Sequence, residues 1–158
     1  MSEQFDLRKH VTTKLKDLGF KKKGVIFTRD YGKFIHLVEF IKSRFGPIYI
    51  VTCGVVHKDF DNKPRTSTIG WHLSKSLPWL LNTEEDARLV MKALDLEKSM
   101  TVEERIQVID NAISNMDEIL KNRWSDEEWV FERGKLPTGK DVNVNGFFQK
   151  AMLGEYED

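Results

Sequence analysis

The pattern of apolar and polar positions predicts an amphipathic helix at the start of the chain. Over residues 3–18 the apolar side chains recur every three or four positions, which places them on one helix face. These side chains are Leu7, Val11, Leu15 and Leu18. Gly19 follows directly, and glycine often occupies the position just after the last helical residue. We therefore expect the helix to end there.

Three hydrophobic runs typical of β-strands come next. Each is rich in Val, Ile, Phe or Tyr, and turn-forming residues separate them. The runs span residues 25–29, 33–43 and 48–57. The second and third runs predict an antiparallel hairpin. If its turn centres on Phe45 and Gly46, the numbers of facing residues sum to about 91.

Alternation along this hairpin assigns its residues to two faces. One face carries Phe34, His36, Val38, Phe40, Lys42, Tyr49, Val51, Cys53, Val55 and His57. The other carries Ile35, Leu37, Glu39, Ile41, Ile48, Ile50, Thr52, Gly54 and Val56. Because both faces are largely apolar, we expect helices to cover the sheet on at least one side.

Helix-start signals mark the C-terminal half. A hydroxyl residue stands three positions before an acidic one, as in a capping box, in the pairs Thr83 with Asp86, Thr101 with Glu104, and Ser125 with Glu128. One helix face after Thr83 would hold Ala87, Val90, Met91 and Leu94. The clearest periodicity follows Thr101, at Val102, Ile106, Ile109, Ile113, Met116 and Leu120. We expect this stripe to pack on the sheet rather than in a coiled coil.

These elements predict a single α+β domain over residues 1–158. It would consist of an N-terminal helix, an antiparallel sheet of about three to four strands, and a helical C-terminal half packed on the sheet. The divisions are a helix with a β-meander at 1–57, a loop at 58–70, a mainly helical part at 71–133 and a tail at 134–158 that could hold a short helix at 146–153.

Composition narrows the class of protein. Apolar residues make up 40% of the chain and charged residues 32%, as in a chain that folds. The N-terminus has no signal-like layout, and no apolar run is long enough for a membrane span, so we expect a cytoplasmic protein without membrane contact. The single cysteine, Cys53, excludes an internal disulfide.

Charge is divided unevenly along the chain although the formal net charge is zero. Residues 1–70 carry 14 Lys and Arg against 7 Asp and Glu, whereas the remainder carries 11 against 18. We expect the two halves to neutralise each other in the fold, with a functional basic face as the alternative. Overall neutrality makes nucleic acid an unfavoured partner.

Conventional catalytic and cofactor motifs are missing. Residues 134–141 match the spacing of a phosphate-binding P-loop, but Asp141 stands where a hydroxyl is required. His36 and His57 share a predicted face with Cys53, yet Cys53 and His57 would lie about 13 Å apart along a strand, too far for one metal ion. We predict no metal and no cofactor. Glu39 could be a general base of raised pKa, an ion-pair partner or an edge residue.

The most binding-like segment is the loop region that ends near His72. Arg65, Thr68, Trp71 and His72 combine types that suit recognition of a protein or a small anion, although Trp71 could instead anchor the loop in the core. The run Lys21, Lys22 and Lys23 is a second candidate surface, with helix capping and solubility as the simpler interpretation.

Several segments of the first half resemble the bacterial family called domain of unknown function 4304. They are the run Leu18-Gly19-Phe20-Lys21-Lys22-Lys23-Gly24, then Phe27 and Arg29, then residues 38–43 and 49–55. Trp71-His72-Leu73 and Trp79 are similar to a further stretch of that family. Ile41 and Thr52 depart from its polar positions, which would remove any polar role there. The resemblance implies a bacterial α+β domain and no particular activity.

The leading functional hypothesis is a non-enzymatic intracellular module that binds another protein, in an immunity-like or regulatory role. One alternative is an enzyme or small-ligand binder whose pocket uses Glu39, His36, His57, Arg65 or His72. The other is weak nucleic-acid binding through the basic N-terminal half. The sequence makes no prediction of oligomeric state.

Overall fold

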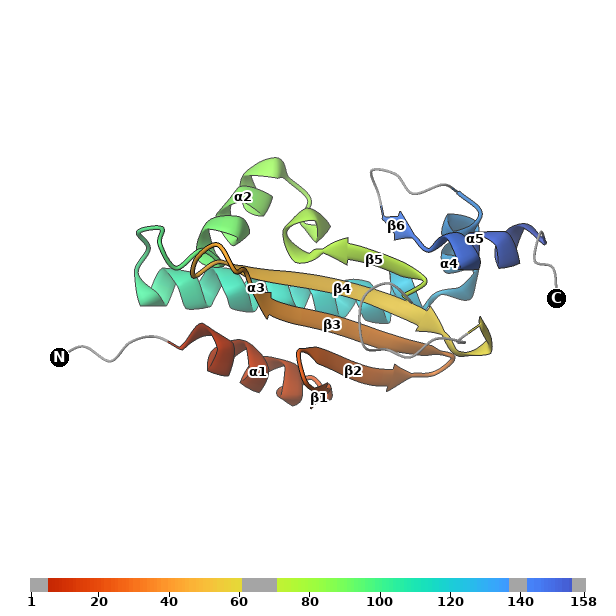
Figure 1. Cartoon of the computed structure of the whole chain (residues 1–158), viewed down its shortest axis with the longest axis horizontal. Coiled ribbons are helices and arrows are strands. Elements are labelled where there is room, and N and C mark those ends of the chain that lie inside the picture. Colours follow the sequence, from red (N-terminus) through yellow and green to blue (C-terminus); the bar gives the residue numbers. More distant parts are fainter. Residues whose placement is uncertain (1–5, 61–70, 137–141, 155–158) are drawn as a thin grey trace.

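The computed structural model describes residues 6–60, 71–136 and 142–154, which form an α+β fold around an antiparallel sheet (Figure 1). The strands lie side by side in the order β1 (Lys21–Lys23), β2 (Ile26–Tyr31), β3 (Phe34–Lys42), β4 (Tyr49–His57), β5 (Leu73–Ser76) and β6 (Asn143–Val144). The α-helices are α1 (Leu7–Asp17), α2 (Glu84–Ala93), α3 (Val102–Lys121), α4 (Glu127–Gly134) and α5 (Gly146–Leu153). Short 3-10 turns are η1 (Lys58–Phe60), η3 (Leu77–Leu80) and η4 (Arg123–Ser125).

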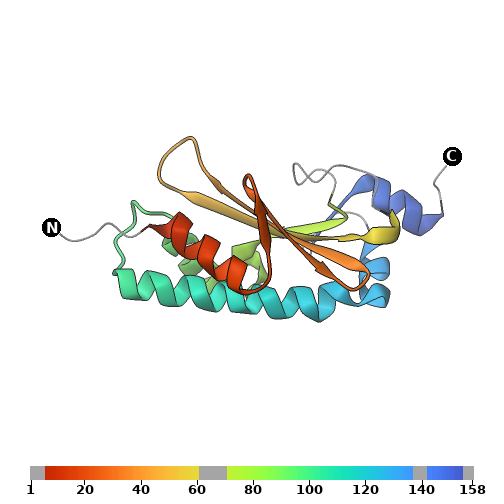
Figure 2. The same cartoon turned by 90° about the horizontal axis from the view of Figure 1, so that it is seen from below.

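The central hairpin has the predicted register. Phe34 faces His57 and Lys42 faces Tyr49, so the paired numbers have the expected sum. One face of the hairpin enters the main hydrophobic core, which α1 and α3 cover, as Figure 2 shows from below. The other face contributes to a smaller cluster formed by Ile26, Ile35, Leu37, Val56 and Trp71. Both faces are therefore partly buried, as their apolar character indicates.

The predicted sheet of three to four strands is too small. Six strands lie in the described ranges, because β1, β5 and β6 add short pieces at the two edges. β1 is the lysine run, and all three of its side chains are exposed, so no apolar alternation marks it as a strand. β6 comes from the C-terminal tail and pairs with Leu73 and Ser74 of β5.

α2 and α3 begin where the sequence predicts, whereas α1 begins at Leu7, after its N-cap Asp6, and not near residue 3. Thr83 and Thr101 accept hydrogen bonds from the backbone N–H groups of Asp86 and Glu104, each at 3.1 Å, and so cap α2 and α3. Gly19 follows α1 with φ 95°, a left-handed conformation that glycine adopts without strain. None of the helices in the described ranges is long and apolar enough to cross a membrane.

The predicted cap of α4 is wrong. Asp126 caps this helix, because its side chain accepts from the N–H of Glu128 at 3.0 Å. The Ser125 hydroxyl instead donates to the carbonyl of Leu120, and it also contacts Nε2 of His36 at 2.6 Å. Ser125 therefore connects the end of α3 to the sheet.

Candidate functional site

The edge of the sheet opens where β5 leaves β4. The ladder between these strands extends to the pair Thr52 and Ser76, after which the chain turns into η3. The start of β4 is attached elsewhere: the N–H of Tyr49 donates to the carbonyl of Leu94, just after α2, at 2.8 Å. The part of β4 between the two attachments therefore borders a groove.

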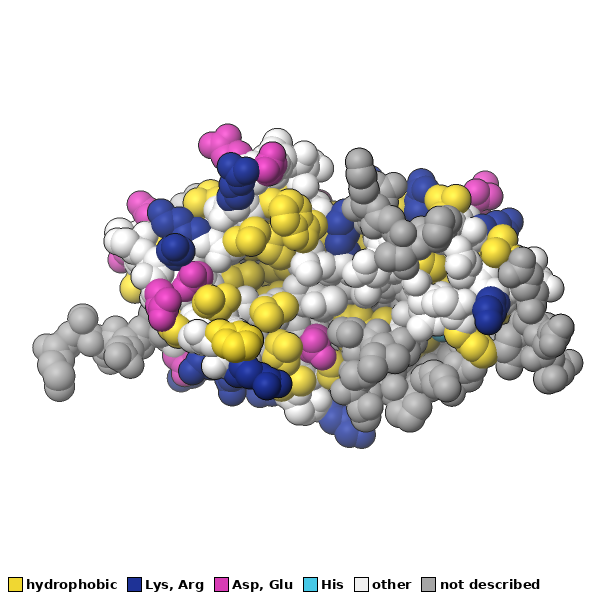
Figure 3. All heavy atoms as spheres, turned by 45° about the horizontal axis from the view of Figure 1, so that its top comes forward, with side chains coloured by type: hydrophobic (Ala, Val, Ile, Leu, Met, Phe, Trp, Pro, Cys, Tyr) yellow, Lys and Arg dark blue, Asp and Glu magenta, His cyan; other side chains and the backbone are white. Residues whose placement is uncertain are grey.

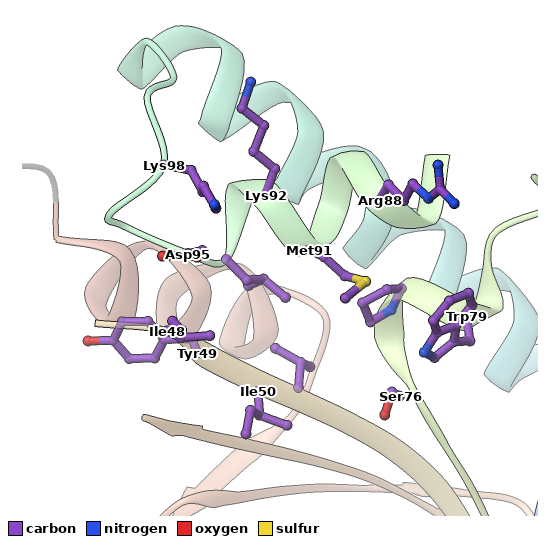
Figure 4. Close-up of a pocket in the computed structure, with 13 residues that line it drawn as sticks. Ile48, Tyr49, Ile50, Ser76, Trp79, Arg88, Met91, Lys92, Asp95 and Lys98 are labelled. Carbon is purple, nitrogen blue, oxygen red and sulfur yellow. The ribbon is translucent and has the colours of Figure 1, made fainter. Parts of the chain in front are cut away.

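This apolar groove has a volume of about 680 Å³ (Figure 4). Its apolar lining comes from β4, η3, α2 and their flanks, and consists of Ile48, Tyr49, Ile50, Val51, Pro78, Trp79, Met91 and Leu94. Met91 points from α2 toward Trp79, and Ile50 lies opposite them on β4. Ile50, Met91 and Trp79 remain 43%, 48% and 50% exposed, so the groove is open to solvent.

Positive charge dominates the rim of the groove. Arg88, Lys92 and Lys98 line it, against the single carboxylate of Asp95. Arg88 is paired with Glu84 at 2.6 Å, whereas Lys92 and Lys98 form no ion pair with any described residue. Figure 3 shows hydrophobic side chains gathered around this hollow, with both basic and acidic side chains at its border. The groove therefore combines an apolar wall with two unneutralised ammonium groups.

The groove offers apolar contact and attraction of negative charge. Its polar lining residues are Tyr49, Ser76, Arg88, Lys92, Asp95 and Lys98.

The most buried polar cluster lies on the helix side of the sheet and surrounds Arg29. Its guanidinium donates to Asp117 of α3 at 2.6 Å, to the carbonyl of Leu18 at 2.9 Å and to Nδ1 of His36 at 3.1 Å. The guanidinium carbon also lies 4.3 Å from the ring centroid of Phe20. Arg29 therefore has a structural role, because its hydrogen bonds connect β2 to β3, to the end of α1 and to α3.

His36 is held in its neutral form in this cluster. Because Arg29 donates to Nδ1, the ring carries its proton on Nε2, which faces Ser125. Burial, together with the nearby charge of Arg29, lowers the pKa of His36 to about 3. His36 is completely buried and does not line the groove.

His57 and His72 are also part of the packing. Nε2 of His57 lies 3.0 Å from Glu127, which in turn pairs with Lys33 at 2.9 Å. The hydrogen bond from Lys33 lowers the pKa of Glu127. Nδ1 of His72 accepts from the N–H of His57 at 2.9 Å, and its ring stacks on Phe148 with centroids 4.3 Å apart. Both imidazole rings therefore connect the sheet to the C-terminal helices.

Glu39 does not join these histidines. It lies opposite Thr52 as predicted, on the other face of the sheet, and it is half-buried. Burial raises its pKa, in line with one of the sequence interpretations. Glu39, His36, His57 and His72 do not line the apolar groove.

The predicted binding residues fall in three places. Trp71 and His72 are buried, with 2% and 3% exposure, and Trp71 packs over Gly54 in the smaller core cluster, as the anchoring interpretation requires. The lysines of β1 are exposed at the sheet edge. Arg65 and Thr68 lie outside the described residues.

Sequence reasoning missed the groove because it assigned Met91 to the buried face of α2. Ala87, Val90 and Leu94 are buried there, but Met91 is turned outward into the groove. The sequence did contain one sign of an exposed apolar surface. α2 carries more large apolar side chains than one helix face can bury, and Leu89 is exposed as well as Met91.

The family comparison agrees with the resemblance seen in the sequence. The model described as Domain of unknown function (DUF4304) matches residues 11–133, which include α1 from Val11, β1 to β5 and all of α2 and α3. No curated protein and no solved structure matches the chain. Because the match covers most of the chain, the protein belongs to the DUF4304 family.

Proposed function

We propose that this domain is a non-catalytic intracellular module that docks a partner protein in the apolar groove. The observation that carries the proposal is the groove itself, a hollow of about 680 Å³ with Ile50, Trp79 and Met91 each close to half exposed. Large contiguous apolar patches on soluble proteins commonly mark interaction sites. In the groove, such side chains surround a cavity.

The residue types of the groove favour a protein as occupant. Trp, Tyr and Met are enriched at protein–protein interfaces, where they fill pockets on the partner or form them. Met91 adds an unbranched side chain that adapts to different partner shapes. An open groove of this kind would accept one or two apolar side chains of a short segment.

The charge of the rim specifies the segment further. Lys92 and Lys98 lack acidic partners among the described residues, and opposite charge on a ligand would complement them. We therefore propose an apolar anchor flanked by Asp or Glu. Ion pairs at an open rim contribute mainly to the association rate and to specificity, and most of the affinity would come from the apolar contacts.

Peptide selection tests this proposal directly. A displayed library of random peptides is selected on the wild-type domain and counter-selected on Met91→Glu, which places a charge among the apolar groups. Recovered peptides should pair apolar residues with Asp or Glu. Fluorescence polarisation should show at least about a tenfold loss of affinity for Met91→Glu, equivalent to about 1.4 kcal/mol.

Leu89→Glu is the matched control, since Leu89 is exposed to a similar degree on the same helix but does not line the groove. It should bind the peptides as the wild type does. Peptides that bind Met91→Glu equally well would contradict the proposal. Recovery of no peptide, together with saturable binding of dodecanoate, would assign the groove to a lipid-like ligand instead.

A further inference from the structure

A second cavity lies on the other side of Trp79 from the apolar groove. It has a volume of about 490 Å³, and β5, η3, α3, η4 and α4 contribute to it. Successive strand residues face opposite ways, so Ser76 lines the groove whereas Lys75, opposite Cys53 on the helix side, lines this second cavity. We call it the cation–tryptophan cleft, after Lys75, Arg123, Arg133, Trp79, Trp124 and Trp129.

Three positive charges meet in this cleft without a carboxylate among its lining residues. Neither Lys75 nor Arg123 nor Arg133 forms an ion pair with another residue in the described ranges. Other cations of the fold do have a counter-charge, as Arg29 has with Asp117 and Arg88 with Glu84. Cations that converge without a counter-charge repel one another, and an anion would relieve that repulsion.

Arg133 carries an additional sign of a missing partner. Its Nε atom is buried, yet no described residue accepts a hydrogen bond from it. A buried donor without an acceptor costs about 1–3 kcal/mol, and such groups call for an explanation. Arg133 lines the cleft, so a ligand oxygen could accept from this guanidinium once the side chain turns toward the ligand.

The tryptophans add flat apolar surfaces to the charges. The guanidinium carbons of Arg133 and Arg123 lie 5.4 Å and 5.9 Å from the ring centroid of Trp129. Trp129 also stacks on Trp124, with centroids 6.1 Å apart and an angle of 23° between the rings. Trp79, which is half exposed, also lines the cleft. The cleft thus combines an exposed indole with guanidinium groups that can donate several hydrogen bonds.

We infer that the cation–tryptophan cleft binds a nucleoside phosphate. Guanidinium groups match phosphate oxygens in charge and geometry, and an indole stacks on a nucleobase whatever the base. The Asn82 side chain, also in the lining, carries both a donor and an acceptor for a base edge. A cavity of about 490 Å³ suits one small ligand, and the neutral net charge of the chain disfavours a long nucleic acid strand.

Calorimetric titration of the full chain with AMP tests the inference, with adenosine, ribose 5-phosphate and O-phosphotyrosine as comparison ligands. AMP should bind with a sub-millimolar Kd that weakens as salt is added. Adenosine and ribose 5-phosphate should each bind at least about tenfold more weakly, because each keeps only half of the contacts. O-phosphotyrosine should also bind more weakly than AMP.

Variants locate the binding. Arg123→Met and Arg133→Met should each weaken AMP binding at least about tenfold, whereas Arg44→Met, which removes an exposed arginine outside both cavities, should leave it unchanged. Arg123 is exposed, so its variant tests the site without risk to the core even if Arg133→Met unfolds. No AMP binding, equal binding to Arg123→Met, or equal affinity for ribose 5-phosphate or O-phosphotyrosine would overturn the inference.

Discussion

Arg29 and His36 show how one buried pair can fix the protonation state of an imidazole. The guanidinium faces Nδ1, and a second proton on the ring would have to occupy that same nitrogen. The charges that surround the ring are Arg29, Asp117 of α3 and, farther away, Lys121. The single nearby carboxylate is already bonded to the arginine, so it does little to favour a charged imidazole.

The free energy of unfolding should therefore depend on pH through His36. The unfolded ring titrates near pH 6.5 and the folded ring near pH 3, so between these values the unfolded state binds more protons. Stability should be fully present above about pH 7 and fall as the pH decreases, by at most about 1.4 kcal/mol per pH unit from this group. Urea titrations from pH 7.5 to pH 4.5 would measure the slope.

His36→Gln is the comparison for this prediction. Above pH 7 the difference between the two proteins gives the cost of the lost packing and hydrogen bonds alone. Below pH 7, the difference in free energy of unfolding should shrink, because only the wild type contains an imidazole that the fold keeps neutral. A constant difference across the whole pH range would show that His36 contributes nothing to the acid response.

At the scale of the elements, β4 needs a glycine at position 54, because the Trp71 ring packs directly against the strand there. A Cβ atom on Gly54 would lie 2.5 Å from the Leu73 carbonyl of β5 and 2.5 Å from the Trp71 ring. Real Cβ atoms do not come so close to other atoms, and the backbone of β5 cannot move away without breaking its ladder with β4. The smaller core cluster thus requires a residue without a side chain at this position.

Gly54→Ala should lower the free energy of unfolding by about 1–3 kcal/mol, the usual cost of overpacking. Gly146→Ala is the control, because a Cβ atom there would meet nothing within 4 Å at the start of α5. Thermal unfolding followed by circular dichroism would compare the two variants. Equal melting temperatures for Gly54→Ala and the wild type would mean that Trp71 repacks without cost.

The elements also show what sequence patterns can and cannot predict. The central hairpin was predictable in register because turn residues and alternation are local signals, and both its faces needed burial. β1 and β6 carried no such signal: one consists of exposed lysines, and the other has two residues that pair with a strand far away in the chain.

The apolar groove was missed for a related reason. Its walls come from three elements, and no single segment reveals that Met91 faces outward.

At the scale of the whole molecule, ion pairs connect the basic and acidic halves of the chain across the α1–α3 contact and the contacts between the sheet and the helices. The cross-half pairs are His10 and Lys14 with Asp110, Arg29 with Asp117, and Lys33 and His57 with Glu127. Most of these pairs are partly exposed and each contributes little to stability. They are individual contacts between the two halves, and the expectation of mutual neutralisation stays a prediction.

Cys53 should report the opening of the whole fold. Its side chain is completely buried at the centre of the sheet, and burial raises the pKa of the thiol to about 12. Alkylation requires an accessible thiolate, so labelling should occur only when the sheet opens. With a stability of about 5 kcal/mol, iodoacetamide should react at least about a thousandfold more slowly with the native chain than with the urea-unfolded chain.

Mass spectrometry of quenched samples would follow this labelling. The logarithm of the native rate should rise with urea concentration with the slope of global unfolding. Rapid labelling in native buffer, or a rate independent of urea, would instead indicate local opening between β4 and β5.

Trp79 separates the apolar groove from the cation–tryptophan cleft, and its indole lines both. A peptide in the groove would favour one rotamer of the Trp79 indole, and a nucleotide in the cleft would contact the indole in that same rotamer. The two binding equilibria would then be thermodynamically linked, and the factor by which a nucleotide changed the affinity for a peptide would equal the factor by which the peptide changed the affinity for the nucleotide. A half-exposed tryptophan at this position would make a docking surface responsive to a metabolite, and Trp79→Ala would uncouple the two ligands.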